Sequence, residues 1–470
     1  MEYNVPSTPR IRCSFSGSSS QHIISQTTRG SSSQQDHLEN HHVEQEDVAD
    51  LVCIPLTKFL TSILDADPDK VTKPNHSNAF HDCRLSLDGQ TELELEHVVY
   101  HAHGRGSTVI KARHIRGNWE DKEVIVKIGF PAEGRQGEDE LVAKAVKKAK
   151  ELGKDHAWAE DHLPTILWSH TYTLDKNSPQ SQLAEYLQQN NLDKHEKRVL
   201  RITVQRILEP ITNLTDPREY AQVFFDVLQI HRWLIDYPKI LQRDISLANV
   251  MFYRKDDGTI RGVLNDFDLA SELPLCSRSS QQRTGTKPYM SADLLSRHWR
   301  RGHDYRHELE ALFYVMLILC CHCNERSSKI QQAMKLPYKS WFRDSYESIA
   351  NEKSSWVSGD RSIQTTSFFS AFRSNLAYLK NRLRSGQAAK VTYYAEQSGH
   401  HEKVQRFAKI GKKVEPFQMS FDWQTLNGKV SYETFKEIMC LFDDKLLVER
   451  YPDELVKPIE DSDFFPQGFV

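Results

Sequence analysis

Long apolar runs, a strong net charge and a regular cysteine pattern are all missing from this sequence. The longest apolar run, residues 311–321, is far shorter than the ~20 residues that a membrane-spanning helix needs. The amino-terminal residues also lack the apolar segment of a secretion signal. We therefore expect no membrane partner, and we expect a protein that is not secreted.

The net charge and the cysteine content indicate which partners and which compartment to expect. A formal net charge of −3 over 470 residues provides no basic field, so we expect no nucleic-acid partner. The eight cysteines are scattered and form no framework, which is typical of a reducing compartment. These features together predict an intracellular protein, either cytoplasmic or nuclear.

The first part of the chain has too few large apolar residues to form a core. Residues 1–50 are rich in Ser, Gln, His and Thr, and such a segment buries too little surface to offset its ordering entropy. We expect a disordered tail there. Residues 51–90 contain a short helix, at 51–64, followed by a linker rich in Pro, Asn, Ser and Asp.

The most informative stretch is a predicted hairpin that brings two polar side chains together. Residues 250–253 and 260–264 are β-prone, and Asp257-Gly258 between them is a strong signal for a two-residue turn. Counting outwards from that turn, Tyr253 pairs with Gly262 and Asn249 pairs with Asp266.

This pairing predicts a metal site at one end of the hairpin. Residues facing each other across antiparallel strands have Cβ atoms about 4.5–5.5 Å apart, which would set the Asn249 amide beside the Asp266 carboxylate. Oxygen ligands of this kind suit Mg²⁺ shared with the phosphates of a nucleotide. Asp244, earlier in the loop, is placed to accept the proton of a substrate hydroxyl.

A helix precedes this loop. Asp216 is a suitable N-cap, Pro217 suits the first helical position, and Glu219 can close a capping box. The residues that follow, to about residue 235, place their apolar side chains on one stripe. His231 within this helix is expected to be a packed histidine rather than a ligand.

A second helix is predicted to be buried almost all round. Residues 303–323 are apolar on every face past Leu309, which is typical of a central core helix. Its three cysteines, Cys320, Cys321 and Cys323, have no partner ligand pair nearby, so we expect buried thiols rather than a zinc site.

Residues 241–270 resemble the catalytic loop H-R-D-x-x-x-x-N and the metal-binding D-F-G segment of eukaryotic protein kinases. The forms RDISLANV and NDFDLA are similar, more narrowly, to those of the fungal-type protein kinase family. The resemblance implies a catalytic Asp244 preceded by the motif's Arg243, with Asn249 and Asp266 as Mg²⁺ ligands beside ATP.

Further motifs follow in the order that the resemblance requires. Residues 103–109 look like a shortened glycine-rich loop over nucleotide phosphates, with Gly104, Gly106 and Val109 as its binding residues. The strand that ends at Lys127 resembles the element whose lysine binds the α- and β-phosphates.

The resemblance also assigns two acidic residues to nucleotide binding. The helix predicted between Gly137 and Gly153 supplies a carboxylate to orient the lysine; Glu138 matches best, and Glu140 is the alternative. Glu209 lies in the segment that resembles the hinge, where backbone groups meet the adenine.

Residues 283–293 resemble the end of an activation segment. The resemblance implies that Thr286 hydrogen-bonds Asp244, and that Glu308 stands where a carboxylate bonds the catalytic-loop backbone. Asp293 replaces the usual glutamate, which we expect to weaken its ion pair. Arg243 beside Asp244 suggests that a phosphate on Ser279, Ser280 or Thr284 orders this loop.

The implied fold is α+β: a bilobal, protein kinase-like arrangement behind the disordered tail. A small antiparallel β-rich N-lobe with one helix would span residues 91–210, with an insertion near 177–198. A larger, mostly helical C-lobe would span residues 211–395. Residues 396–470 form a basic, partly helical C-terminal extension.

The predicted function is an ATP- and Mg²⁺-dependent protein kinase that phosphorylates Ser/Thr hydroxyls of unidentified protein substrates. Three departures from the general kinase pattern favour an alternative, a pseudokinase scaffold: Gln242 replaces a His, Ser246 replaces a Lys, and the third loop glycine is missing. Asp268 replaces the Gly of D-F-G, as in the fungal type. A small-molecule phosphotransferase of the aminoglycoside or choline kinase type is a further alternative.

Overall fold

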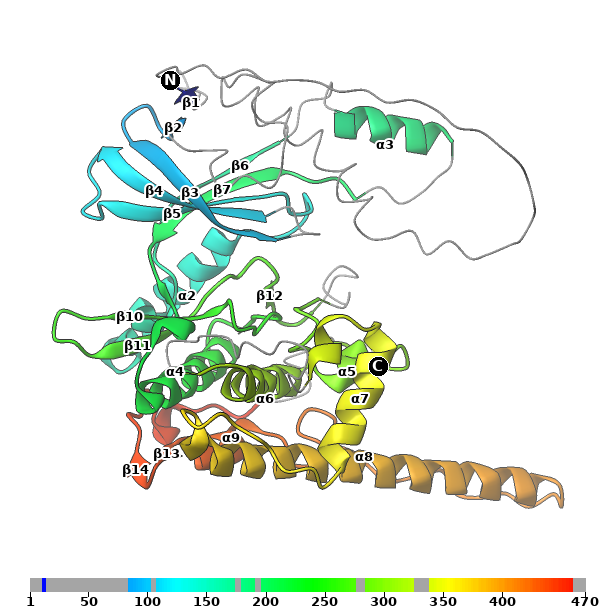
Figure 1. Cartoon of the computed structure of the whole chain (residues 1–470). Coiled ribbons are helices and arrows are strands. Elements are labelled where there is room, and N and C mark those ends of the chain that lie inside the picture. The colour runs from blue at the N-terminus through cyan, green and yellow to red at the C-terminus, as the bar shows by residue number, and fades with distance from the viewer. Residues whose placement is uncertain are drawn as a thin grey trace, which may run out of the picture. The chain divides into compact units, whose positions relative to one another are not determined.

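A computed structural model describes residues 11–13, 83–102, 107–173, 179–190, 196–275, 284–324 and 338–459. The chain divides into two compact units, which are described separately (Figure 1). The first unit comprises Met1–Arg135 and Thr165–Ile207, and the second comprises Gln136–Pro164 and Leu208–Val470.

Most of the predicted tail, and the whole helix predicted at 51–64, lie outside the described residues. Within the tail the structure describes one strand, β1 (Ile11–Cys13), which pairs with β2 (Cys83–Ser86).

The first unit is a curled antiparallel sheet of seven strands in the order β1-β2-β3-β4-β5-β7-β6. Its strands after β2 are β3 (Glu92–Ala102), β4 (Ser107–Arg116), β5 (Glu123–Gly129), β6 (Ile166–Tyr172) and β7 (Leu200–Arg206). Helix α3 (Pro179–Gln189) lies between β6 and β7 in the chain, within the predicted insertion. Alternate strand residues face one side of the sheet, so one apolar layer forms its core. That layer includes Leu93, Leu95, Ile110, Ala112, Val124, Val126, Ile202 and Val204.

The second unit is mostly helical and, in the residues that the structure describes, contains three small sheets of short strands. Its longer helices are α2 (Glu138–Leu152), α4 (Pro217–Asp236), α6 (Tyr305–His322), α7 (Tyr346–Ser358), α8 (Arg373–Ala408) and α9 (Tyr432–Met439), and α5 (Ala292–Leu295) is a single turn. Its strands are β8 (Glu209–Pro210), β9 (Ile240–Leu241), β10 (Val250–Arg254), β11 (Ile260–Leu264), β12 (Ser271–Glu272), β13 (Leu441–Phe442) and β14 (Lys445–Leu446). An antiparallel β-rich unit and a helical unit are the predicted α+β fold class, which is therefore confirmed.

Helix α2 belongs to the second unit, whereas the predicted N-lobe included it. It begins after Gly137 and ends before Gly153, whose φ of +86° suits glycine at a helix end. The following 3₁₀-helix, Lys154–His162, joins α2 to the second unit because its buried His162 hydrogen-bonds the carbonyl oxygen of Gly262 at 2.6 Å. The boundary between the units thus follows packing rather than chain order.

Helix α4 begins as expected, with one difference. The Asp216 side chain accepts a hydrogen bond from the Arg218 amide at 2.9 Å, and Pro217 follows it. Glu219 does not close a capping box; its carboxylate binds the Arg254 guanidinium at 2.7 Å instead. The nearby arginine is the stronger partner because both groups are charged.

Helix α6 is the buried central helix that the sequence predicts. Every residue from Tyr305 to Cys321 is buried, and Cys320 and Cys321 lie inside the helix among apolar side chains. Among the described residues, no helix combines the length and the apolar character needed to cross a membrane.

The start of α6 contains a histidine that must be neutral. The backbone N–H of Asp304 donates to Nδ1 of His307 at 2.9 Å, so that nitrogen carries no proton. Burial, with Arg306 and His303 nearby, holds the pKa of His307 well below its usual value. A histidine with a lowered folded-state pKa binds fewer protons than it does in the unfolded chain, so stability falls as pH drops below about 6.5.

We expect His307→Gln to reduce this loss of stability in acid. Glutamine can accept the same hydrogen bond from Asp304 and does not titrate, which removes up to about 1.4 kcal/mol per pH unit from the slope. Chemical denaturation between pH 7 and pH 5 measures the effect. The exposed His298, changed in the same way, is the control; an equal slope in both variants would contradict the assignment.

Candidate active site

The predicted hairpin forms, but the pairing of its two strands is shifted by one residue from the predicted register. Phe252 faces Gly262 and Val250 faces Leu264, so the predicted pairing of Tyr253 with Gly262 is wrong. The turn has three residues rather than two, because Lys255 and Thr259 close it with a backbone hydrogen bond of 2.9 Å.

Turn chemistry explains the extra residue. The Asp257 carboxylate accepts the Thr259 N–H at 2.8 Å, and Gly258 adopts a φ of +80°. A glycine in the left-handed region is typical of a three-residue hairpin loop with a bulge. Asn249 therefore lies opposite Asn265, whose N–H donates to the Asn249 carbonyl oxygen at 2.8 Å, and the predicted direct pairing with Asp266 is wrong.

Asp266 lies one residue beyond that pair, after the end of strand β11. Its backbone has a φ of +61°, a left-handed conformation that aspartate tolerates better than most residues. Its Oδ1 accepts the Asp268 N–H at 3.3 Å. Asn249 and Asp266 thus lie at the same end of the hairpin, though not as facing partners.

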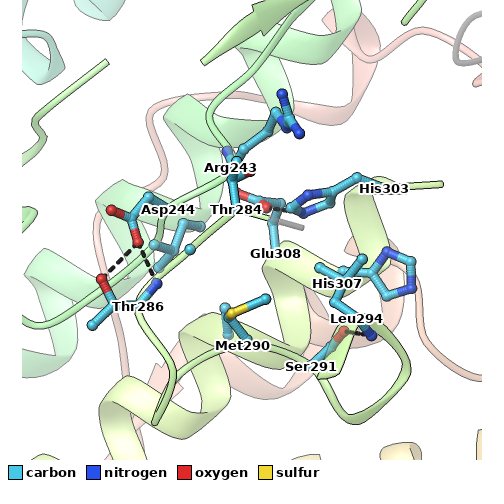
Figure 2. A pocket seen from close by; sticks show the side chains of 13 residues that line it. Arg243, Asp244, Thr284, Thr286, Met290, Ser291, Leu294, His303, His307 and Glu308 are labelled. Carbon is cyan, nitrogen blue, oxygen red and sulfur yellow. Dashed lines mark hydrogen bonds and ion pairs between the residues drawn. The ribbon is translucent and has the colours of Figure 1, made fainter. Parts of the chain in front are cut away.

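Asp244 is held by the segment predicted to meet it. Both the N–H and the hydroxyl of Thr286 donate to Asp244 Oδ1, each at 2.8 Å, as Figure 2 shows. The Asn249 side-chain amide donates to the Asp244 carbonyl oxygen at 2.8 Å. Because Nδ2 of Asn249 is used in this way, its amide oxygen is the atom that remains to bind a cation.

Gln242, which replaces the histidine of the general kinase motif, connects two parts of the site. Its side-chain oxygen accepts the Asp244 N–H at 2.7 Å, and its side-chain nitrogen donates to the Asp266 carbonyl oxygen at 3.0 Å. Gln242 is fully buried. One amide thus joins the loop that carries Asp244 to the strand end that carries Asp266, a role that sequence reasoning missed.

Glu308 of α6 binds the backbone of the loop that carries Asp244. Its Oε2 accepts the Arg243 N–H at 2.9 Å, and Arg243 has a φ of +70°. Nε2 of His303 lies 2.5 Å from Oε1, and Nε2 of His231 lies 3.6 Å from Oε2 (Figure 2 shows His303 and Glu308). Burial raises the pKa of Glu308, but the two histidines outweigh it and lower the pKa to about 2.

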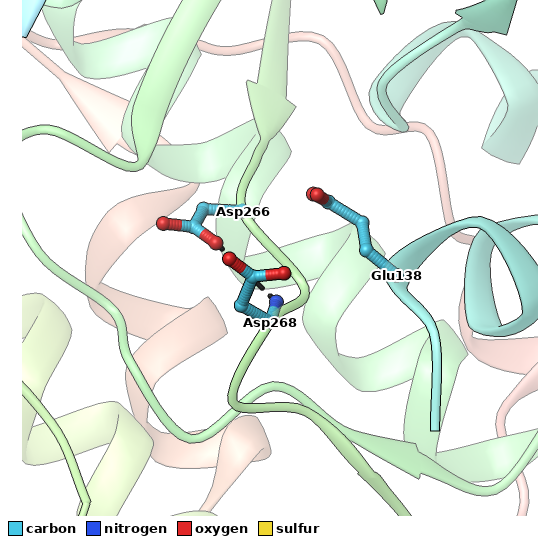
Figure 3. Close-up of side chains that lie close together, drawn as sticks. All are labelled: Glu138, Asp266 and Asp268. Carbon is cyan, nitrogen blue, oxygen red and sulfur yellow. Dashed lines mark hydrogen bonds between the residues drawn. The ribbon is translucent and has the colours of Figure 1, made fainter. Parts of the chain in front are cut away.

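Three carboxylates gather beside the hairpin end, as Figure 3 shows. Oxygen atoms of Glu138, Asp266 and Asp268 all lie within 4.8 Å of one another. Glu138 is buried and also accepts the Phe267 N–H at 2.9 Å, whereas the alternative Glu140 is exposed. Of the two acids left open by the sequence, Glu138 is therefore the one that faces the site.

Two of the predicted nucleotide residues, Val109 and Lys127, lie on the sheet of the first unit. Lys127 of β5 faces Val109 of β4 and Thr203 of β7, and is 8% exposed. Gly104 and Gly106 lie outside the described residues. In the second unit, Glu209 of β8 faces Phe252 of β10 and has an exposed side chain.

The residues suggested as phosphorylation sites are described only in part. Ser279 and Ser280 lie outside the described residues, and Thr284 lines the pocket beside Arg243 (Figure 2). The Arg243 side chain is buried and donates to the Ser271 hydroxyl at 3.0 Å.

Asp293 keeps its ion pair despite being shorter than glutamate. Its carboxylate binds the Arg306 guanidinium at 2.8 Å and the Lys390 ammonium at 2.5 Å. Burial raises the pKa of Asp293, but Arg306 and Lys390 outweigh it and hold the pKa below its usual value. The expected weakening is therefore wrong, because a lysine from α8 supplies a second cation.

The segment after Thr286 is fixed by a buried lysine of α7. Lys353 donates to the carbonyl oxygens of Pro288 at 2.9 Å and Met290 at 2.5 Å, and its ammonium lies 3.8 Å from the centre of the Tyr314 ring. Its side chain is fully buried. This contact holds the backbone of the segment that also contacts Asp244.

We expect Lys353→Met to lower the free energy of unfolding by about 1–3 kcal/mol, because two buried carbonyl oxygens lose their donor. Urea denaturation measures the change. Lys147→Met, at a side chain that is 79% exposed, is the matched control and should have little effect. Equal stabilities of the two variants would show that Lys353 does not hold this segment.

The chain is similar to one protein family in sequence and to a solved structure. The fungal protein kinase family model matches residues 66–320. A solved structure described as "Structure of vaccinia related kinase 3" is similar at 14% sequence identity and a TM-score of 0.39, over 62% of this chain and 81% of that one. No curated protein matches the sequence. Since the family model covers more than half of the sequence, this chain belongs to the fungal protein kinase family.

Proposed function

We propose that the protein is an ATP- and Mg²⁺-dependent protein kinase that transfers the γ-phosphate to Ser/Thr hydroxyls of protein substrates. One observation carries the proposal: Asp244 accepts both hydrogen bonds from Thr286, while Gln242 joins the same loop to Asp266. A catalytic carboxylate and a metal carboxylate are thereby held relative to each other. Phosphoryl transfer requires this positioning more than any covalent chemistry.

The roles of the residues follow from their contacts. Asp244 orients the substrate hydroxyl and accepts its proton, and Thr286 holds its carboxylate in place through the hydrogen bonds described above. Asn249 and Asp266 hold Mg²⁺, which supplies charge neutralisation at the phosphates when it is bound. Lys127 binds the α- and β-phosphates.

The carboxylate cluster supports a divalent cation. Glu138, Asp266 and Asp268 bring oxygen atoms of three acidic groups within 4.8 Å of one another. Hard oxygen ligands of this kind suit Mg²⁺. Asp268, which stands where other kinases have glycine, is thus a candidate for an additional ligand in this protein.

A peptide substrate is favoured over a small molecule by the segment that follows Thr286. Lys353 fixes the backbone of Pro288 and Met290, so the chain beside Asp244 presents a defined surface. Small-molecule phosphotransferases of the aminoglycoside or choline kinase type lack such a segment. The pseudokinase alternative retains support from Ser246 and from the missing third glycine.

A peptide array separates these alternatives. The purified chain, Mg²⁺ and γ-labelled ATP should label Ser/Thr peptides and leave choline and aminoglycosides unlabelled. Labelling of the small molecules alone would favour the phosphotransferase. Absence of labelling, together with no Mg²⁺-dependent thermal stabilisation by ATP, would favour the pseudokinase.

A further inference from the structure

The C-terminal part of the chain, beyond the region that the family model matches, contacts the helix beneath the catalytic loop. The match ends at residue 320, whereas Tyr432 begins α9 and lies against His231 of α4. The Tyr432 hydroxyl and Nδ1 of His231 are 2.5 Å apart, and both side chains are buried.

The contact continues towards the catalytic loop. The other ring nitrogen of His231, Nε2, lies 3.6 Å from Oε2 of Glu308. That same oxygen accepts the Arg243 N–H at 2.9 Å, and Arg243 directly precedes Asp244. A phenol, an imidazole and a carboxylate thus form one line from α9 to the peptide that carries Asp244.

The Tyr432 hydroxyl is the hydrogen-bond donor in this arrangement of three side chains. Burial raises the pKa of Tyr432 well above its usual value, so the hydroxyl keeps its proton at neutral pH. The Tyr432 hydroxyl therefore has a proton to donate to Nδ1 of His231. Nε2, the other nitrogen of the same ring, faces the Glu308 carboxylate, so the imidazole lies between the phenol and the carboxylate.

We propose that Tyr432 is a positioning residue for the catalytic loop, acting through His231 and Glu308 on the Arg243–Asp244 peptide. The inference rests on the proposed kinase function for its catalytic consequence, but its structural part does not. It makes the segment after residue 320 a functional part of the site.

The ring of Tyr432 is held independently of its hydroxyl. It stacks on Tyr305 with centroids 4.7 Å apart and an interplanar angle of 11°, and the Arg232 guanidinium lies 4.8 Å from its centre. Phenylalanine can keep both contacts. Tyr432→Phe therefore removes the hydrogen bond to His231 and leaves the packing in place.

Tyr451→Phe is a matched control. Tyr451 is a buried tyrosine from the same C-terminal segment, and its hydroxyl donates to Asp236 at 2.7 Å, away from Glu308. Hydrogen–deuterium exchange on the full chain should show faster exchange of the amides in residues 240–250 for Tyr432→Phe and no change there for Tyr451→Phe. His231→Asn, which keeps an acceptor near Nδ1 but lacks the group facing Glu308, should give the same acceleration as Tyr432→Phe.

In kinase assays kcat should fall roughly fivefold to tenfold for Tyr432→Phe, with KM for ATP unchanged, as expected for the loss of one hydrogen bond. Wild-type exchange in residues 240–250 of both Tyr432→Phe and His231→Asn would overturn the inference. Exchange does not require catalysis, so a chain that shows the predicted exchange but transfers no phosphate would refute the proposed function alone.

Discussion

Asp244→Asn should lower the rate of phosphate transfer by about 10²–10⁴-fold, the usual contribution of a positioned general base. Asparagine cannot take the proton of the substrate hydroxyl. Its side-chain oxygen can still accept both hydrogen bonds from Thr286, so the fold and the Thr286 segment should be retained. The measurement is kcat on a peptide identified by the array, together with calorimetric titration of Mg²⁺·ATP.

The control makes the same chemical change at an exposed position of the hairpin turn. Asp256→Asn should leave kcat within about twofold, because surface substitutions away from a site rarely matter. Nucleotide affinity should be similar in wild type and both variants. If Asp244→Asn retains wild-type kcat, Asp244 does not have the proposed role.

Arg450→Met should lower the free energy of unfolding by about 3–5 kcal/mol, the usual cost of leaving a buried charge without its partner. Asp226 of α4 is fully buried, and its Oδ1 accepts a hydrogen bond from the Arg450 guanidinium at 3.2 Å. Gln222 donates to the same oxygen and the Gly262 amide to Oδ2, but neither carries a charge. Equilibrium denaturation in urea measures the loss.

A double variant distinguishes a buried charge from lost packing. Asp226→Asn combined with Arg450→Met removes both charges, so it should be more stable than Arg450→Met alone. Arg382→Met, which breaks an exposed pair with Glu437, should cost less than about 1 kcal/mol. If Arg382→Met and Arg450→Met are equally stable, the C-terminal segment does not neutralise Asp226.

Local signals made much of the fold predictable. The glycines at 137 and 153 bound α2, Asp216-Pro217 begins α4, and continuous apolar character marks α6 as the central helix. Each of these features depends on residues within a few positions of one another. Two hydrogen bonds were expected from the order of the kinase motifs, that of Thr286 to Asp244 and that of the loop backbone to Glu308. Both are present, and the backbone donor to Glu308 is the Arg243 N–H.

The hairpin shows how a small local effect changes a site. Two turns were compatible with Asp257-Gly258, and the Asp257 side chain favoured the longer one by binding the Thr259 N–H. One additional turn residue moves every pair by one position, so Asn249 faces Asn265 instead of Asp266. Strand propensity alone does not determine this choice.

Contacts between residues far apart in the sequence could not be predicted from local sequence patterns. Gln242 joins Asp244 to Asp266 only because β10 and β11 return the chain to the loop. His231 is packed, as expected, but its partners Tyr432 and Glu308 lie far away in the sequence. A buried carboxylate such as Asp226 has no sequence motif, since its partner Arg450 arrives from the C-terminal segment.

The central claim is that the hairpin end binds a divalent cation for phosphate transfer. The most direct test is a crystal structure with Mn²⁺ and a non-hydrolysable ATP analogue, in which anomalous scattering locates the metal. The account predicts Mn²⁺ bound by the Asp266 carboxylate and the Asn249 amide oxygen, beside the nucleotide phosphates. Bound nucleotide without a metal at Asp266, or metal at a place that neither residue reaches, would contradict it.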